Sequence, residues 1–402
     1  MIKSKSSTYS SRKIQRNSGY AANILRLAFS QWGARLGLIW ICLLTIVAVF
    51  APFIANSHPW LLSEQGNVSS PLFTYISAAD ITLVALFIAV IILLVKKSSM
   101  KVVIAVMATV LVLVGGLSSL FVSTPQLATY EQYREKQNNN QYDWVIWAPI
   151  AYSAKDYIRD EGDTGLEAPL AAKQRTHIFG TDENGADVLS RMIHASRIAL
   201  GIGFVATGIA LIIGVIIGGL MGFYSGVIDM LGMRLVEIFE AIPTLFLLLT
   251  FVAFFGRSLY IMMVIIGLTS WSGYARYVRA EFLKLREQDF VQSAIACGLP
   301  LRSILFRHML PNGIAPVLVG VSFGVASAIL AEATLSFLGL GLVDDPSWGQ
   351  MLNQAVRSST FNWWMAVFPG GAIFLTVFAY NLMGESLRDA IDPQLNKSDK
   401  KA

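Results

Sequence analysis

Long apolar segments constrain this chain more than any other feature. Eight stretches each approach or exceed the roughly 20 residues that an α-helix needs to cross a hydrocarbon core. The chain is 54% hydrophobic and 14% charged, whereas soluble domains carry about 25% charged residues. Because a bilayer offers no water to an unpaired backbone, we expect helices and an all-α, polytopic integral membrane fold. The expected spans are residues 36–55, 78–95, 102–122, 198–224, 230–256, 259–275, 314–338 and 363–384.

A polar segment at residues 287–312, which we call the elbow, interrupts the apolar pattern. Asp289 followed by Gln292 has the D-x-x-Q form of a capping box, and Gly298 predicts a helix end. A second helix is expected from Pro300, with one apolar stripe made of Leu301, Ile304, Leu305 and Met309, and ended by Pro311, Asn312 and Gly313. A soluble partner protein could bind such an amphipathic hairpin and move the membrane spans beside it.

The distribution of lysine and arginine predicts how the chain is inserted. With the N-terminus in the cytoplasm, most of the 31 basic residues fall in inner segments, including those of the elbow. Most of the others lie in the long 123–197 segment, which exceeds the loop length to which the positive-inside rule applies. The elbow and both termini are therefore expected in the cytoplasm, and the net charge of +5 needs no nucleic-acid partner.

The elbow resembles the E-A-A-x3-G-x9-I-x-L-P loop of bacterial ABC importer permeases, on which the ATPase subunits dock. The aligned residues are Gln292, Ser293, Ala294, Gly298, His308, Leu310 and Pro311. Gln292, Ser293 and His308 depart from the pattern, and the other four match. The resemblance implies that these seven positions couple the chain to ATPase subunits.

Two further runs resemble signatures of the dipeptide, oligopeptide and nickel branch of that family. The first, residues 177–200, contains Gly180, Thr181, Asp182, Asp187 and Arg191; the second, residues 331–352, contains Pro346 and Trp348. From the residues themselves, Thr181 or Asp182 is expected to cap a helix whose Val188, Met192 and Ala195 face the membrane. Arg191, Arg197 and Trp348 would anchor at the outer interface. The first run is either a contact surface for a substrate-binding protein or a solvated helix without a ligand contact.

The resemblance implies a type I ABC importer permease fold, in which six spans are supplemented here by an inserted hairpin. The expected parts are a cytoplasmic tail (1–33), the first span with the extra hairpin (34–122), an extracytoplasmic segment (123–197), a permease core (198–386) with its coupling loop (285–312), and a second cytoplasmic tail (387–402). It also implies a bacterial inner-membrane complex with a second permease, two ATPases and an extracytoplasmic binding protein. ATP and Mg²⁺ would be bound by the ATPases, and no cofactor by this chain.

Glu332 is an ionisable residue inside a span, which makes it a candidate, together with Ser336, for lining the substrate pathway. The alternative is a structural polar contact with the surface formed by Ser322, Ser327 and Thr334 or with the second permease.

The sequence contains no motif for catalysis. It has no G-x4-G-K-[ST] or H-E-x-x-H pattern, and an S-x-x-K spelling at Ser98 and Lys101 lies in a short basic turn without an oxyanion site. The four histidines and two cysteines suggest no metal site. Peptide import is the favoured function, nickel or another small solute is the alternative cargo, and a passive channel, a scaffold or a membrane-embedded hydrolase are alternatives of other classes.

Overall fold

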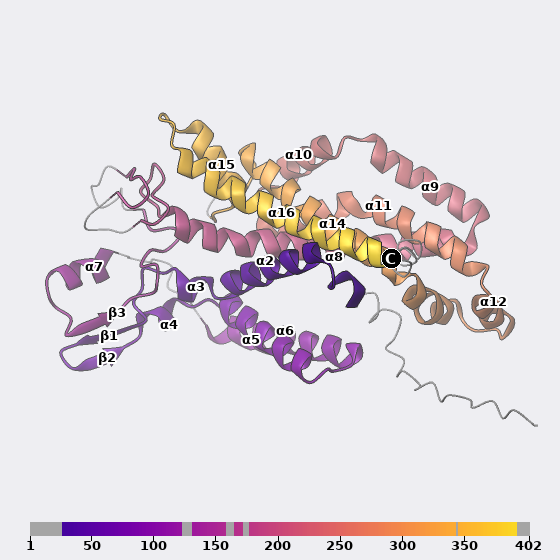
Figure 1. The fold of residues 1–402 in the computed structure, drawn as a ribbon, viewed down its shortest axis with the longest axis horizontal. Helices are drawn as coiled ribbons and strands as arrows, with labels where there is room; N and C mark the ends of the chain where they lie inside the picture. The colour runs from indigo at the N-terminus through magenta and orange to yellow at the C-terminus, as the bar shows by residue number, and fades with distance from the viewer. Residues whose placement is uncertain (1–25, 123–130, 158–164, 172–176, 343–344, 392–402) are drawn as a thin grey trace, which may run out of the picture.

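Helices built from the apolar segments run along the long axis of the molecule (Figure 1). The computed structural model describes residues 26–122, 131–157, 165–171, 177–342 and 345–391, so most of the expected tails at 1–33 and 387–402 lies outside the described residues. The helices that match expected spans are α2 (Trp32–Val49), α5 (Ala78–Val95), α6 (Met100–Phe121), α8 (Val188–Tyr224), α14 (Leu310–Phe337) and α16 (Trp363–Ile391). The predicted helical, polytopic fold class is confirmed.

Two of the eight expected spans differ from a simple apolar helix. The segment at 230–256 consists of α9 (Gly226–Ala241) and α10 (Thr244–Phe255), which meet at an angle of 81°. The bend falls at Ile242, because the following Pro243 pushes it out of the helical region. The other, α11 (Leu259–Arg286), is 28 residues long but more polar. By length and composition, six of the described helices could cross a membrane, or seven with the bent pair, so the expected number of eight is approximate.

A small antiparallel sheet at one end of the molecule was not expected. Its strand order is β2-β1-β3, so the loop after the first span folds together with the distant 123–197 segment. The strands are β1 (Leu61–Glu64), β2 (Asn67–Ser69) and β3 (Trp144–Ile146), and the short helices α3 (Ala51–Ile54), α4 (Pro71–Tyr75) and α7 (Glu131–Asn138) lie in the same part of the chain. Figure 1 shows the sheet and α7 at the end opposite α12 (Asp289–Ala296).

The core of the bundle is organised around α8, which packs most extensively against α11 and also contacts α14 and α2. Glycines make the approach to α11 close. A Cβ on Gly214 would lie 2.4 Å from the Cβ of Tyr274, and one on Gly218 would lie 2.3 Å from the carbonyl oxygen of Ala275. Small residues four positions apart are the usual means by which membrane helices approach at backbone distance.

Candidate functional site

The elbow folds as two helical segments around a left-handed glycine. The first segment, α12, has Cys297 as its C-cap, and the following Gly298 has a φ of +71°. The Gly298 N–H donates to the Ile295 carbonyl at 2.9 Å, and the Leu299 N–H donates to the Ala294 carbonyl at 3.2 Å. This pair of bonds is a Schellman motif, which favours glycine because a Cβ is unfavourable in that conformation. The predicted helix end at Gly298 is confirmed.

The predictions for the two ends of the elbow are wrong. The N-cap of α12 is Gln288 rather than Asp289, without a side-chain cap, and Gln292 instead donates from Nε2 to the Arg286 carbonyl at 2.9 Å. At the other end Pro311 does not terminate a helix. After α13 (Leu301–Ser303), a π-helical turn, η2 (Ile304–Met309), runs directly into α14. Pro311 lies in the first turn of α14, where helices tolerate proline.

The inner face of the elbow is packed against the helices on either side of it. The predicted apolar stripe is buried at Ile304, Leu305 and Met309, and Leu301 packs at its edge. One cluster contains Val278 and Phe282 of α11, Val291 and Ala294 of α12, Ile304, Leu305 and Met309 of η2, and Val317 of α14. A displacement of the elbow must therefore move the adjoining ends of both α11 and α14.

The seven residues aligned with the coupling motif lie on both faces of the elbow. Gln292, Ser293, Gly298 and Pro311 are exposed, His308 and Leu310 are half-buried, and Ala294 is buried. Phe290, Ile295 and Phe306 are also exposed, although they are large and apolar. An exposed apolar surface with polar neighbours is typical of a protein contact site.

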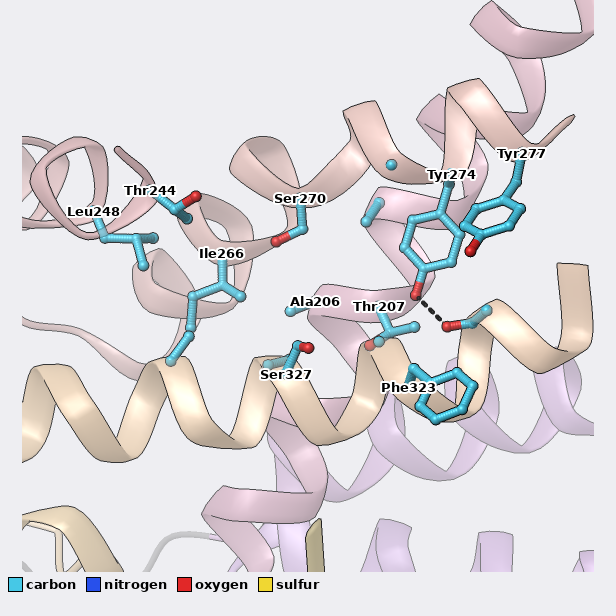
Figure 2. A pocket seen from close by; sticks show the side chains of 16 residues that line it. Ala206, Thr207, Thr244, Leu248, Ile266, Ser270, Tyr274, Tyr277, Phe323 and Ser327 are labelled. Carbon is cyan, nitrogen blue, oxygen red and sulfur yellow. Dashed lines mark hydrogen bonds between the residues drawn. The ribbon is translucent and has the colours of Figure 1, made fainter. Parts of the chain in front are cut away.

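A cavity of about 370 Å³ lies between α8, α10, α11 and α14 (Figure 2). Figure 2 shows Ser270 and Tyr274 pointing from α11 toward Thr207 of α8 and Ser327 of α14. The polar lining consists of hydroxyl groups, from Thr207, Thr244, Ser270, Tyr274, Tyr277 and Ser327, and the rest is apolar or glycine. These lining residues include no carboxylate, imidazole, thiol or basic group.

This set of hydroxyl residues was not predicted from the sequence. A signal was present, since Thr207, Ser270 and Tyr274 are polar groups within segments long enough to span a membrane. What the sequence lacked was the relative rotation of α8, α11 and α14, which brings these side chains to one space.

The pathway candidates Glu332 and Ser336 do not line this cavity. Glu332 is 1% exposed, and its Oε1 accepts a hydrogen bond from Ser336 Oγ at 2.6 Å. The turn after α14 covers the pair so closely that a Cβ on Gly341 would lie 2.2 Å from Ser336 Oγ. This is a structural polar contact, as in the alternative given above, but its partner is Ser336 rather than Ser322, Ser327, Thr334 or the second permease.

The outer signature segment is a folded cap on α8, and the predicted capping residue is wrong. Asp187 is the N-cap, because its Oδ2 accepts from the Ser190 N–H at 2.7 Å while its Oδ1 bonds His177 Nδ1 at 2.9 Å. Asp182 instead stabilises the preceding loop, where its Oδ1 accepts from the N–H groups of Asn184 and Ala186, each at 2.9 Å.

The two arginines of this segment also differ from the expected interfacial anchors. Arg191 is 3% exposed and pairs with the carboxylate of Asp182, and Arg197 pairs with Asp80 at 2.6 Å. Val188 and Ala195 are buried in the core rather than facing the membrane, and Met192 packs at the edge of that core.

The remaining signature residues are internal too. Gly180 has a φ of +77°, and Thr181 Oγ1 donates to the Gly165 carbonyl at 2.6 Å. Pro346 is buried, and Trp348, at the start of α15 (Trp348–Arg357), is 2% exposed and donates from Nε1 to the Met192 carbonyl at 3.2 Å. Trp348 is therefore a core residue and not an interfacial anchor.

The residues that the structure describes contain no group of three or more His, Cys, Asp or Glu side chains placed to hold a metal ion. The fold and site together define a polytopic helical membrane protein with a hydroxyl-lined cavity and an elbow that joins two of the cavity walls.

Comparison with known proteins identifies the family. Residues 214–397 match the family described as binding-protein-dependent transport system inner membrane component. The oligopeptide transport system permease protein OppC of Haemophilus influenzae is 36% identical over 251 residues, which cover 62% of this chain and 81% of that protein. The dipeptide transport system permease protein DppC of Alkalihalophilus pseudofirmus is 37% identical over 252 residues, with the same coverage of 62% and 81%.

The chain therefore belongs to the family of binding-protein-dependent inner-membrane transport components, the permease subunits of ABC importers, and is a multi-pass inner-membrane protein. A permease of this kind works together with ATPase subunits and a substrate-binding protein. Among solved structures, a chain of the MetNI methionine ABC transporter in an inward-facing conformation is similar with a TM-score of 0.42 and 18% identity, covering 50% of this chain and 96% of that chain.

Proposed function

We propose that the chain is one of two permease subunits of an ATP-driven peptide importer, assembled with two ATPases and an extracytoplasmic binding protein. The observation that carries the proposal is the shared packing of the elbow with α11 and α14. Both helices also line the 370 Å³ cavity. A push on the elbow by an ATPase is therefore transmitted to two walls of the cavity, as alternating access by rigid-body movement requires.

In this proposal the exposed positions Gln292, Ser293 and Pro311 contact the ATPase, together with Phe290 and Ile295. Ala294 and Gly298 hold the shape of the elbow, since the first is buried and the second sets the break. The buried signature residues Asp182, Asp187 and Arg191 shape the outer surface offered to the binding protein rather than contacting it themselves.

Peptide is the cargo that the cavity and the relatives favour. The lining of the cavity offers hydroxyl groups without fixed charges, so the cavity suits cargo whose side chains vary from one molecule to the next. The relatives are named as oligopeptide and dipeptide permeases. A nickel pathway has less support, because imidazole and similar ligands preferred by that ion are absent from the lining residues.

The orientation can be tested with the native cysteines. Cys297 is exposed beside Gly298 in the elbow, and Cys42 is exposed on α2. In a Cys42→Ser background, a membrane-impermeant maleimide should label Cys297 in inverted vesicles only, and a Glu64→Cys reporter on the sheet in intact cells only. Labelling of Cys297 from outside would overturn the proposed topology and the ATPase contact with it.

Partner composition separates an importer from a passive channel or scaffold. The tagged chain, purified in mild detergent, should retain a second permease and ATPase subunits whose hydrolysis is stimulated by a peptide-loaded binding protein. A chain that purifies alone and conducts peptides without ATP would be a channel.

A further inference from the structure

A second cavity, of about 600 Å³, lies where the inserted α5–α6 hairpin meets the core. Its walls come from α5, α8, the loop after α3 and the start of α11, at the end of the bundle that carries the sheet. Its volume is in the usual range of about 300–1,000 Å³ for small-molecule sites. It shares no lining residue with the hydroxyl-lined cavity, and the import mechanism above does not use it.

One half of this cavity is lined by two ion pairs. Arg197 Nη1 lies 2.6 Å from Asp80 Oδ1, and Lys155 Nζ lies 2.9 Å from Asp345 Oδ1. The charges of the two cations and two carboxylates sum to zero. The Asp80 side chain is only 8% exposed. Each cation keeps donors for a ligand, because a guanidinium has five N–H donors and an ammonium three.

Two histidines, His58 and His194, also line the polar half of the cavity. His58 Nδ1 bonds Asn56 Oδ1 at 2.8 Å, and its ring stacks on Tyr75 with centroids 3.7 Å apart. Burial lowers the pKa of His58 to about 4, so this ring is neutral near pH 7. His194 Nε2 bonds the Ala55 carbonyl at 3.0 Å.

The other half of the cavity is apolar. Leu83 follows Asp80 by about one turn of α5, Ile198 follows Arg197 on α8, and Leu259 begins α11. The 37 residues of α8 extend about 55 Å at 1.5 Å per residue, well beyond a hydrocarbon core of about 30 Å. At least one end of α8 must therefore extend beyond the hydrocarbon core, and Arg197 lies within about three turns of the start of this helix.

We propose that this cavity binds one zwitterionic phospholipid, with its phosphate at Arg197 and Lys155, its amine at Asp80 and Asp345, and an acyl chain beside Leu83 and Ile198. The balanced charges of the lining match a phosphoethanolamine headgroup. An anionic lipid would bring uncompensated negative charge toward two carboxylates. The bound lipid would fill the gap between hairpin and core. The position of this lipid in the outer leaflet rests on the proposed topology, whereas the cavity and its lining residues do not depend on it.

The test is lipid retention by the intact purified complex, measured by native mass spectrometry after exchange into dioleoyl-phosphatidylethanolamine, dioleoyl-phosphatidylglycerol or the chainless glycerophosphoethanolamine. The wild type should retain one phosphatidylethanolamine. Arg197→Gln should reduce retention by about tenfold through the lost charged contact. Leu83→Trp, which fills the apolar half and leaves every charge in place, should reduce it as well.

Lys136→Gln provides a control, because Lys136 forms an ion pair with Glu64, at 3.0 Å, that is more exposed than the Arg197 pair and does not line the cavity. This variant should retain the lipid. Equal retention of phosphatidylglycerol, equally strong binding of the chainless headgroup, or unchanged retention in both Arg197→Gln and Leu83→Trp would each overturn the proposal. ATPase subunits retained in the same samples report on the importer assignment independently.

Discussion

The hydroxyl group of Tyr274 on α11 donates a hydrogen bond to the carbonyl oxygen of Gly320 on α14, 3.2 Å away, at the wall of the hydroxyl-lined cavity (Figure 2). The same two helices are joined again at the elbow by the cluster around Phe282 and Val317. They are thus linked at the cavity and at the elbow, so movement at one level constrains the other.

The contact between Tyr274 and α14 should be sensitive to a single methyl group. A Cβ on Gly324 would lie 1.6 Å from Tyr274 Oη, so Gly324→Ala must displace the ring and should cost about 1–3 kcal/mol by overpacking. Tyr274→Phe loses only the hydrogen bond, about 1 kcal/mol. Thermal unfolding in detergent and peptide uptake measure both effects. Gly208→Ala is the control, since nothing lies within 4 Å of its added Cβ; equal behaviour of the two alanine variants would contradict this account.

Substitution of Gly298 should separate insertion from coupling. A residue with a side chain at a φ of +71° costs about 1–2 kcal/mol, and asparagine tolerates this conformation better than others. We expect Gly298→Glu to insert normally but to lose peptide-stimulated ATP hydrolysis, and Gly298→Asn to keep most of it. The measurement is the rate of peptide-stimulated ATP hydrolysis by each variant in proteoliposomes. Wild-type coupling in Gly298→Glu would show that the elbow is not the docking site.

Removal of Arg191 should destabilise the outer cap of α8. The side chain is 3% exposed and pairs with Asp182, which is equally buried. Breaking a buried pair on one side leaves an uncompensated charge and costs about 3–5 kcal/mol. Arg191→Leu should therefore lower the amount of folded protein in the membrane, as measured by fluorescence size-exclusion chromatography. Arg357→Leu, at an exposed arginine of α15, should not; similar losses in both variants would argue against the buried pair as the cause.

The part of the chain around the sheet should lose stability in acid through His58. Burial lowers the pKa of this group from 6.5 to about 4 in the folded state. Between these values the unfolded state binds a proton that the folded state does not. The contribution of His58 to the free energy of unfolding is therefore fully present above pH 6.5 and is lost as the pH falls toward 4. Limited proteolysis of proteoliposomes across this window should show faster cleavage near β1 at the acid end. His58→Gln should flatten the dependence, and an unchanged profile would point to other groups.

Much of the architecture could be predicted from local patterns. Apolar runs predicted α5 at its observed bounds, and Gly298 predicted the break in the elbow. Predictions of individual polar contacts were less successful. Asp289 and Thr181 or Asp182 were expected as helix caps, but Gln288 and Asp187 hold those positions. Several side chains near a helix start can serve as its cap, and packing around the loop decides which one does.

The sequence by itself determined that the chain is a helical membrane protein, where most spans lie and which family it belongs to, because these follow from composition, periodicity and residue order along one segment. Only the tertiary structure decided that Arg191 and Trp348 are internal, that Glu332 bonds Ser336, and that hydroxyl groups from α8, α11 and α14 share a cavity. These features depend on how helices distant in sequence are rotated and packed against one another. A residue's own neighbours along the chain do not specify that relationship.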